Sequence, residues 1–192
     1  SSIKANVSRV IFTSSDKAVN PTSTMGATKL LGEKLITAAN QHSGGHMTIF
    51  SSVRFGNVLD TNGSVLQIFK NQINKNIPLT VTSTNMTRFF ITMSQALQLC
   101  LHAAEEMIGG EIFVMSMGSC NIMSLASAVC GNDEFKYDII GQKPGEKENE
   151  ELVTDSESVR TVCKDHFYTI LPEMRSIMDV TIVDKYKKAY KN

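Results

Sequence analysis

Short apolar runs alternate with segments of helical hydrophobic periodicity along this chain. The apolar run at residues 10–13 predicts a buried strand, and leucine and isoleucine at helical spacing predict a helix over residues 21–40. The same patterns predict further strands over 47–59, 78–82, 111–117 and 137–140, and further helices from Ser64 onward and over 92–107, 122–129 and 163–178. Strands that alternate with helices are typical of an α/β fold.

Two of the predicted helices begin with a capping-box pattern. Gln67 follows Ser64 by three residues, and Gln95 follows Thr92 by the same spacing. The helix after Thr92 is rich in apolar residues and is predicted to be strongly buried. Residues 148–158 are acidic and are predicted to be solvated.

The composition excludes several classes of function. The chain has 192 residues and a formal net charge of zero, so no broad electrostatic attraction to nucleic acid or an anionic membrane is expected. No apolar run is long enough to span a bilayer. The four cysteines form no C-x-x-C pair, which favours free thiols in the cytoplasm. His42 and His46 lack a third ligand nearby, so no metal site is predicted.

The loop between the first strand and its helix gathers polar groups. Ser15, Asp16 and Lys17 stand together at the end of the strand. Lys29 follows Met25 by one helical turn, which directs both side chains toward the loop. One acid, two amines and a hydroxyl can transfer protons or bind the hydroxyls and phosphates of a nucleotide. A capped helix start with solvated charges is the alternative.

A longer motif contains this loop. Residues 16–29 read D-K-A-V-N-P-T-S-T-M-G-A-T-K. This segment resembles the active-site segment of extended short-chain dehydrogenase/reductases. It is most similar to the nucleotide-sugar 4,6-dehydratases of bacterial polysaccharide synthesis, the CapD-like group that acts on UDP-N-acetylglucosamine. The resemblance continues through residues 53–59, 63–65, 79–82, 86–90, 109–114 and 144–147.

The resemblance implies an α/β fold of two parts. Residues 1–77 and 88–120 are expected to form the C-terminal part of a Rossmann-like parallel sheet. Residues 78–87 and 121–192 are expected to form a small α/β subdomain, which binds the UDP-sugar, and a tail. The family holds its dinucleotide at a Gly-rich turn after the first strand. No G-x-x-G-x-x-G occurs in this sequence, so the Gly-rich N-terminal half is expected to be absent, and the full-length form to be a homo-oligomer.

The resemblance also implies catalytic roles around the loop. Asp16 would be the acid at the C6 hydroxyl of the sugar, Lys17 the base at C5, and Ser15 would orient the C4 hydroxyl. Met25 stands where most short-chain dehydrogenases carry a tyrosine base, and a thioether cannot take a proton. The base for the C4 hydroxyl therefore stays open between Lys17, Asp16 and a water molecule.

NADP or NAD is the cofactor that the resemblance implies. The preference stays open because the residues that set it belong to the Gly-rich half. Lys29 would hold the nicotinamide ribose. Ser14, Phe55 and Gly56 are the other expected cofactor contacts, and Gly56 permits a close approach of the backbone.

The resemblance places the contacts with the sugar nucleotide on later segments. Arg88 and Lys143 would meet the diphosphate, and Glu146 would accept the ribose hydroxyls. Relatives usually carry arginine where Lys143 stands, and lysine lacks the bidentate fork of arginine. The expected substrate-binding residues are Asn57, Ser64, Val65, Thr80, Arg88, Lys143 and Glu146. By residue chemistry alone, a turn asparagine, a surface arginine and a solvated Pro-Gly turn are the alternatives.

Three functions remain open at this point. The Asp16–Lys17 pair, together with Lys29, Arg88 and the P-G-E-K segment, favours a UDP-N-acetylglucosamine 4,6-dehydratase. The missing Gly-rich turn favours an inactive sugar-nucleotide-binding remnant. A nucleotide-sugar epimerase of the same fold is disfavoured by the Asp16–Lys17 pair.

Overall fold

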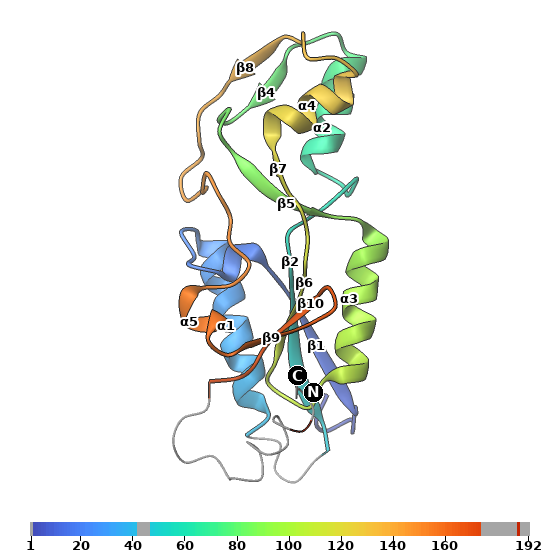
Figure 1. Ribbon diagram of the computed structural model, residues 1–192, viewed down its shortest axis with the longest axis vertical. Helices are drawn as coiled ribbons and strands as arrows, with labels where there is room; N and C mark the ends of the chain where they lie inside the picture. The colour runs from blue at the N-terminus through green and yellow to red at the C-terminus, as the bar shows by residue number, and fades with distance from the viewer. Residues whose placement is uncertain (1, 42–46, 174–187, 189–192) are drawn as a thin grey trace.

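A five-stranded sheet forms the lower half of the computed structural model, which describes residues 2–41, 47–173 and 188 (Figure 1). Its strands are β1 (Arg9–Ser15), β2 (Ile49–Phe55), β6 (Ile112–Met115), β10 (Phe167–Ile170) and β9 (Thr161–Lys164), in this order across the sheet. β1, β2 and β6 are parallel, whereas β10 is antiparallel to both of its neighbours. The sheet therefore begins as a Rossmann-like sheet and ends in an antiparallel hairpin.

Two helices cover opposite faces of this sheet. α1 (Thr24–Ala39) connects β1 to β2, and α3 (Met93–Glu106) precedes β6 (Figure 1). The core between α3 and the sheet contains Val53, Leu99 and Phe113, all of which are fully buried. Parallel strands with helices on both faces confirm the predicted α/β fold.

A smaller unit forms the upper half of Figure 1. Two short parallel strands, β4 (Leu79–Val81) and β8 (Tyr137–Ile139), lie beside α2 (Val65–Asn74) and α4 (Ile122–Cys130). Its apolar core contains Phe69, Leu79, Val81, Met86, Ile122 and Ala126. Between the two halves lies a three-stranded sheet of β3 (Asn57–Val58), β5 (Thr87–Ile91) and β7 (Ser119–Asn121).

One long segment returns from the upper half to the lower half. After β8 the chain runs down past the end of α1 to the short helix α5 (Asp155–Ser158) (Figure 1). We call residues 143–151 of this segment the strap. The strap thus lies between the upper unit and the loop that follows β1.

The end of the chain differs from its predicted structure. A helix was expected over residues 163–178, but residues 161–170 form the β9–β10 hairpin. Their β-branched and aromatic side chains favour strands, and Asp165 takes a positive φ of 57° in the two-residue turn. These strands extend the sheet of β1, β2 and β6. Residues 174–178 of the predicted helix lie outside the described residues.

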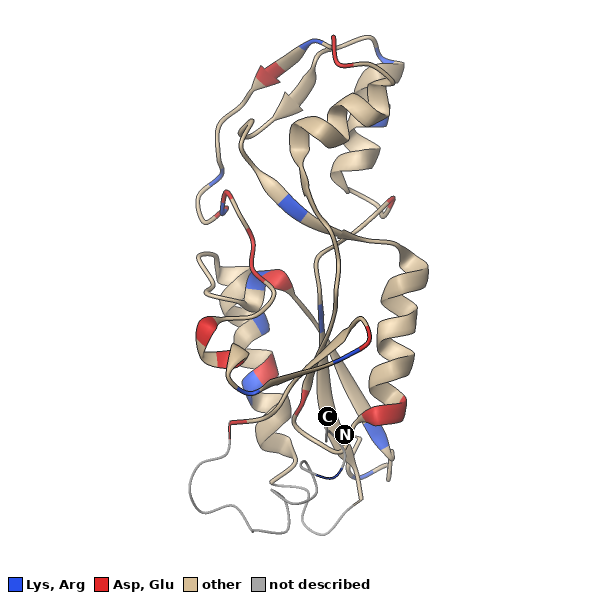
Figure 2. Cartoon of the chain, in the orientation of Figure 1, with Lys and Arg blue, Asp and Glu red and all other residues tan. Residues whose placement is uncertain are grey.

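Fewer of the apolar residues of α3 are buried than the sequence predicts. Ala96, Leu99 and Ala103 are buried, but Leu97 and Leu101 are 57% and 64% exposed. One face of α3 rests on the sheet, and Figure 2 shows no charged residue along the helix before its C-terminal end. The predicted capping box at Thr92 is confirmed, because Thr92 and Gln95 exchange both capping hydrogen bonds.

The predicted solvation of residues 148–158 is wrong for Glu150, which is buried, and for Glu157. The Glu157 carboxylate accepts hydrogen bonds from Arg54 at 3.0 and 3.1 Å, and Arg54 also binds Glu33 of α1 at 2.7 and 3.1 Å. Burial alone raises the pKa of Glu157, but hydrogen bonds from Arg54 outweigh burial and hold the pKa below its usual range. Burial lowers the pKa of Arg54, and hydrogen bonds to the two glutamates raise it above its ordinary value.

The predictions for metals and membranes concern the whole chain, and the structure describes part of it. Among the described residues, no group of three or more His, Cys, Asp or Glu side chains is placed to hold a metal ion. His42 and His46 lie outside those residues. Within the same ranges, no helix combines the length and apolar content needed to cross a membrane.

Candidate functional site

The loop after β1 forms a tight turn around a buried carboxylate. Ser15 ends β1 and caps the 3-10 helix η1 (Asp16–Ala18), since its Oγ accepts a hydrogen bond from the amide of Lys17 at 3.1 Å. The same hydroxyl donates to Asp16 Oδ1 at 2.8 Å. Asp16 is fully buried, and Lys17 Nζ lies 2.9 Å from the same Oδ1. Ser15, Asp16 and Lys17 are thus brought together as the sequence predicts.

The second oxygen of Asp16 distinguishes this turn from an ordinary ion pair. Oδ2 is buried and has no hydrogen-bond partner among the described residues. Lys17 Nζ also lies 3.4 Å from Asn57 Oδ1 in β3. An acid and an amine in contact, with one carboxylate oxygen left unpartnered, can exchange a proton with a third group.

Lys29 and Met25 take no part in the hydrogen bonds of the Asp16–Lys17 pair described above. Ser23 caps α1 by accepting a hydrogen bond from the amide of Gly26, so the helix begins at Thr24. Lys29 Nζ donates to the carbonyl oxygen of Thr13 in β1 at 2.9 Å. Met25 is 48% exposed on the first turn of α1.

The other predicted cofactor contacts lie at the ends of β1 and β2. The Ser14 hydroxyl is buried and has no partner among the described residues, and Phe55 pairs in register with Ser15. A Cβ on Gly56 would lie 2.5 Å from the carbonyl oxygen of Phe89. Packing against β5 therefore requires glycine at position 56, whatever binds nearby.

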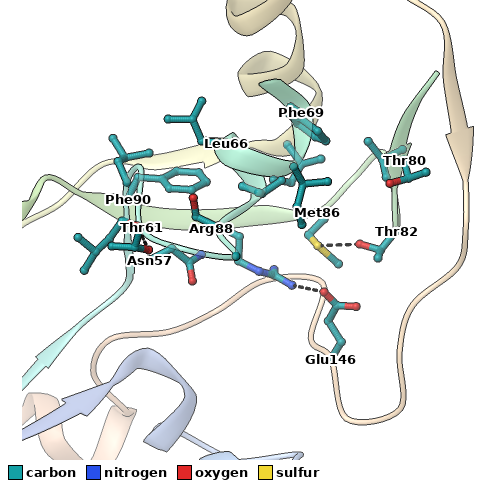
Figure 3. A pocket seen from close by; sticks show the side chains of 18 of the residues that line it. Asn57, Thr61, Leu66, Phe69, Thr80, Thr82, Met86, Arg88, Phe90 and Glu146 are labelled. Carbon is teal, nitrogen blue, oxygen red and sulfur yellow. Dashed lines mark hydrogen bonds and ion pairs between the residues drawn. The ribbon is translucent and has the colours of Figure 1, made fainter. Parts of the chain in front are cut away.

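A cavity of about 400 Å³ lies in the upper half of the molecule, next to β3 (Figure 3). It has the size and the mixed polar and apolar lining of small-molecule sites. All seven residues predicted to bind the substrate line it: Asn57, Ser64, Val65, Thr80, Arg88, Lys143 and Glu146. These residues come from segments as far apart as β3 and the strap.

Sequence reasoning missed most of the apolar wall of this cavity. Leu66, Phe69, Met86 and Phe90 also line it (Figure 3), and so does Ile122. Helical periodicity marks Phe69 as a core residue, and the others carry no local pattern that separates a cavity wall from a core. Their place follows from the packing of α2 and α4 against β4 and β5.

Arg88 reaches the cavity from β5. Nη1 donates to the carbonyl oxygens of Thr87 at 2.7 Å and Glu148 at 3.0 Å. Nη2 donates to the carbonyl oxygen of Lys147 at 2.8 Å and lies 3.4 Å from the Glu146 carboxylate (Figure 3). Most of the partners of Arg88 are neutral, so its charge is only partly balanced by the protein.

Ser64 begins α2 but does not form the predicted capping box. Its side chain makes no capping hydrogen bond, and Gln67 donates instead to Asp60 Oδ1 at 2.7 Å. Gln67 therefore points away from the backbone amide that a capping box requires. The Ser64 hydroxyl is buried beside the cavity and has no partner among the described residues, and it lies at a helix N-terminus, which favours anions.

The remaining predicted residues are held by local hydrogen bonds. Gln72 of α2 binds both Thr80 Oγ1 at 2.8 Å and the Thr80 amide at 3.2 Å, which fixes the edge of β4. Glu146 Oε2 accepts from the Lys143 amide at 3.1 Å, which closes the Pro-Gly turn of the strap. Asn57 contacts Lys17 and also lines the cavity, so it joins the cavity to the Asp16–Lys17 pair.

Known proteins resemble this chain over most of its length. The family model described as "Polysaccharide biosynthesis protein" matches residues 1–172. An uncharacterized membrane protein of Methanocaldococcus jannaschii is 44% identical over 160 residues, 79% of this chain and 48% of that protein. A UDP-N-acetylglucosamine 4,6-dehydratase (inverting) of Campylobacter jejuni is 38% identical over 174 residues, 89% of this chain and 51% of that enzyme. A UDP-glucose 4-epimerase of Rickettsia bellii is also 38% identical, over 173 residues with the same coverage.

A solved structure agrees with these sequence matches. The X-ray structure of Pen from Bacillus thuringiensis has a TM-score of 0.84 and 40% sequence identity, and the match covers 89% of this chain and 55% of that chain. The chain spans about half the length of the three relatives above. It belongs to the polysaccharide biosynthesis protein family, as a member of the CapD-like extended short-chain dehydrogenase/reductases.

Proposed function

We propose that this chain carries the sugar-nucleotide site and the acid–base pair of a UDP-N-acetylglucosamine 4,6-dehydratase of polysaccharide biosynthesis. One observation carries the proposal: a single cavity is lined by all seven motif residues, and Asn57 joins it to the Asp16–Lys17 pair. A dehydratase needs both parts, because it must hold the nucleotide firmly while protons move at the sugar.

The cavity suits a nucleoside diphosphate. Arg88 and Lys143 supply positive charge at its wall, and Ser64 supplies, at the N-terminus of α2, a hydroxyl without a partner in the described part of the chain. Glu146 offers carboxylate oxygens to ribose hydroxyls. Phe69 and Phe90 supply apolar surface for the base.

The Asp16–Lys17 pair can perform the elimination of water across C5 and C6 of the sugar. Lys17 removes the proton at C5, and Asp16 gives a proton to the C6 hydroxyl as it leaves as water. The contact of 2.9 Å between Lys17 Nζ and Asp16 Oδ1 then returns a proton from the lysine to the carboxylate and restores the pair. Asp16 Oδ2, which has no hydrogen-bond partner among the described residues, is the oxygen free to give this proton.

A bound NAD or NADP would supply the hydride chemistry that this elimination requires. The residues at the end of β1 fit the nicotinamide end of such a cofactor, since the buried Ser14 hydroxyl has no partner among the described residues and Lys29 of α1 binds the carbonyl oxygen of the preceding residue, Thr13. Ser14 and Lys29 would hold its ribose and amide groups. Ser15 would orient the C4 hydroxyl of the sugar, next to Asp16.

The test is turnover in heavy water followed by proton NMR. The chain is assayed alone and as a chimera with the N-terminal half of the Campylobacter jejuni dehydratase, with UDP-N-acetylglucosamine and NAD or NADP. We expect a 4-keto-6-deoxy sugar that carries deuterium at C5, and the configuration at C5 reports inversion or retention. Tight UDP binding without product from either protein would favour the inactive sugar-nucleotide-binding remnant.

An epimerase is the second candidate, because the similar protein from Rickettsia bellii is named a UDP-glucose 4-epimerase. Epimerisation at C4 removes no proton from C5 and no water from C6. A product that retains its C5 hydrogen and its C6 hydroxyl would favour this function. An Asp16→Asn variant in the chimera adds a second discriminator, since the loss of the acid should lower dehydration by roughly 10²- to 10⁴-fold.

A further inference from the structure

The strap connects the wall of the cavity to the loop that holds Asp16 and Lys17. On the cavity side, Arg88 donates to the carbonyl oxygens of residues 147 and 148, and the amide of Thr87 donates to the same oxygen of Glu148 at 3.0 Å. Glu146 faces the cavity beside Arg88 (Figure 3). The strap is therefore part of the cavity wall.

The other side of the strap is bonded to the catalytic loop. Thr22 Oγ1 donates to the carbonyl oxygen of Gly145 at 2.7 Å, and Lys147 Nζ donates to the carbonyl oxygen of Val19 at 2.5 Å. A Cβ on Gly145 would lie 2.8 Å from the carbonyl oxygen of Thr22, so the two segments touch here. Loop and strap are thus in direct contact along residues 19–22 and 145–147.

Lys147 is bonded on both sides at once. Its carbonyl oxygen accepts from Arg88 at the cavity wall, and its ammonium group binds Val19 in the loop. The side chain is 16% exposed and lies 3.7 Å from Glu150, which balances its charge. Among the described residues, the Lys147 side chain forms no hydrogen bond or ion pair with Ser15, Asp16 or Lys17, so it can act on the chemistry only through its neighbours.

A second hydrogen bond connects Val19 to the Asp16–Lys17 pair. The amide of Val19 donates to the carbonyl oxygen of Asp16 at 3.0 Å, which closes the turn of η1. Val19 itself is 1% exposed, so its carbonyl oxygen depends on Lys147 in place of water. The position of Lys147 therefore influences the turn that holds the Asp16 carboxylate and the Lys17 amine.

We propose that Lys147 is a positioning residue that couples occupancy of the cavity to the geometry of the Asp16–Lys17 pair. A ligand that binds Arg88 or Glu146 fixes the conformation of the strap. The hydrogen bond between Lys147 and Val19 then restricts the conformation of residues 16–19. The inference rests on the proposed function in naming UDP as the probe for the cavity. Its structural link, between the strap and the loop, can be tested without any ligand.

The test is hydrogen–deuterium exchange of the 192-residue chain, with and without UDP. Lys147→Met removes the ammonium group at similar length, Lys147→Arg retains a donor, and Lys70→Met is the control because Lys70 forms an exposed pair with Asp60. Without ligand, Lys147→Met should speed exchange in residues 16–23 by roughly tenfold, the factor expected for a lost charged hydrogen bond. Lys147→Arg and Lys70→Met should stay close to the wild type.

With UDP bound, protection of amides from exchange should extend from the segments that line the cavity to residues 16–23, both in the wild type and in Lys147→Arg. In Lys147→Met it should stay in the cavity segments, an outcome that a merely structural role would not produce. Unchanged exchange of residues 16–23 in ligand-free Lys147→Met would overturn the inference, as would protection that still reaches them. If UDP protects no segment of the wild type or of any variant, the proposed function fails. Exchange of the ligand-free proteins still tests whether Lys147 connects the strap to residues 16–23. If Lys147→Met also speeds exchange throughout β2, it is unfolding, and Lys147→Gln replaces it.

Discussion

Two buried arginines, one in the five-stranded sheet and one in the three-stranded sheet between the two halves, have different surroundings. Arg54 in β2 is 1% exposed and binds two carboxylates, those of Glu33 and Glu157. Arg88 in β5 is 7% exposed and binds three backbone carbonyl oxygens, with one carboxylate at 3.4 Å. The protein more than balances the charge of Arg54, whereas Arg88 retains capacity for an anion. The charge of its partners, more than its burial, separates a structural arginine from one that can bind a ligand.

The largest effect should come from Arg54→Met. The substitution leaves Glu33 and Glu157 buried without their cation, so the free energy of unfolding should fall by about 3–5 kcal/mol. Urea unfolding measures this loss. Lys70→Met, which breaks an exposed pair, should change stability by less than about 1 kcal/mol. A loss for Arg54→Met as small as that of the control would contradict its structural role.

Arg88→Met should act on binding more than on stability. Loss of a charged donor at the cavity should weaken UDP binding roughly 10- to 100-fold by calorimetry. Stability should fall less than in Arg54→Met, because the one carboxylate left behind, that of Glu146, is 26% exposed. The comparison between the two arginines fails if Arg88→Met binds UDP as the wild type does.

A change of pH should have a smaller effect on the stability of the folded protein, and this effect should depend on Glu157. Its pKa is lowered in the folded protein, so its contribution to stability is present above the unfolded pKa of about 4.5 and is lost as pH falls through the folded value. Glu157→Gln should cost about 1 kcal/mol at pH 7, since a charged hydrogen bond becomes neutral. In thermal unfolding experiments from pH 7 to pH 3, the difference in stability between the wild type and Glu157→Gln should disappear. A constant gap over this range would contradict the ion cluster.

The smallest effect on stability should come from Ser64→Ala. An N-cap serine normally contributes about 1 kcal/mol, but the Ser64 hydroxyl makes no capping bond, so the change should stay within about 0.5 kcal/mol. UDP binding should weaken a few-fold. Thr92→Ala is the matched control, because Thr92 does cap α3 and its loss should cost about 1 kcal/mol. Equal losses of stability in both variants would show that Ser64 acts as a cap.

The sequence predicted the features that depend on local patterns or on a long motif. Apolar runs located β1 and β2, and the seven residues predicted to bind the substrate all line the cavity. Thr92 and Gln95 form the predicted capping box at the start of α3, where both residues are exposed. At Ser64 the same pattern fails, since Asp60 competes for the side chain of Gln67.

Contacts between distant segments could not be read from the sequence. Arg54 meets Glu33, 21 residues away, and Glu157, 103 residues away, and neither spacing carries a local pattern. Lys147 meets Val19 across 128 residues for the same reason. The β9–β10 hairpin was predicted as helix although its β-branched and aromatic side chains favour strands, and only the pairing of β10 with β6 places these strands in the sheet.

The most direct test of this account is a titration of the ¹⁵N-labelled 192-residue chain with UDP-N-acetylglucosamine, followed by NMR. We expect the largest shifts at the amides of Asn57, Ser64, Thr80 and Arg88, with further shifts at Asp16 and Lys17. UDP alone should reproduce the first set and shift the second set less, because it lacks the sugar. Shifts confined to segments outside the cavity, or no binding at millimolar ligand, would contradict a sugar-nucleotide site beside the Asp16–Lys17 pair.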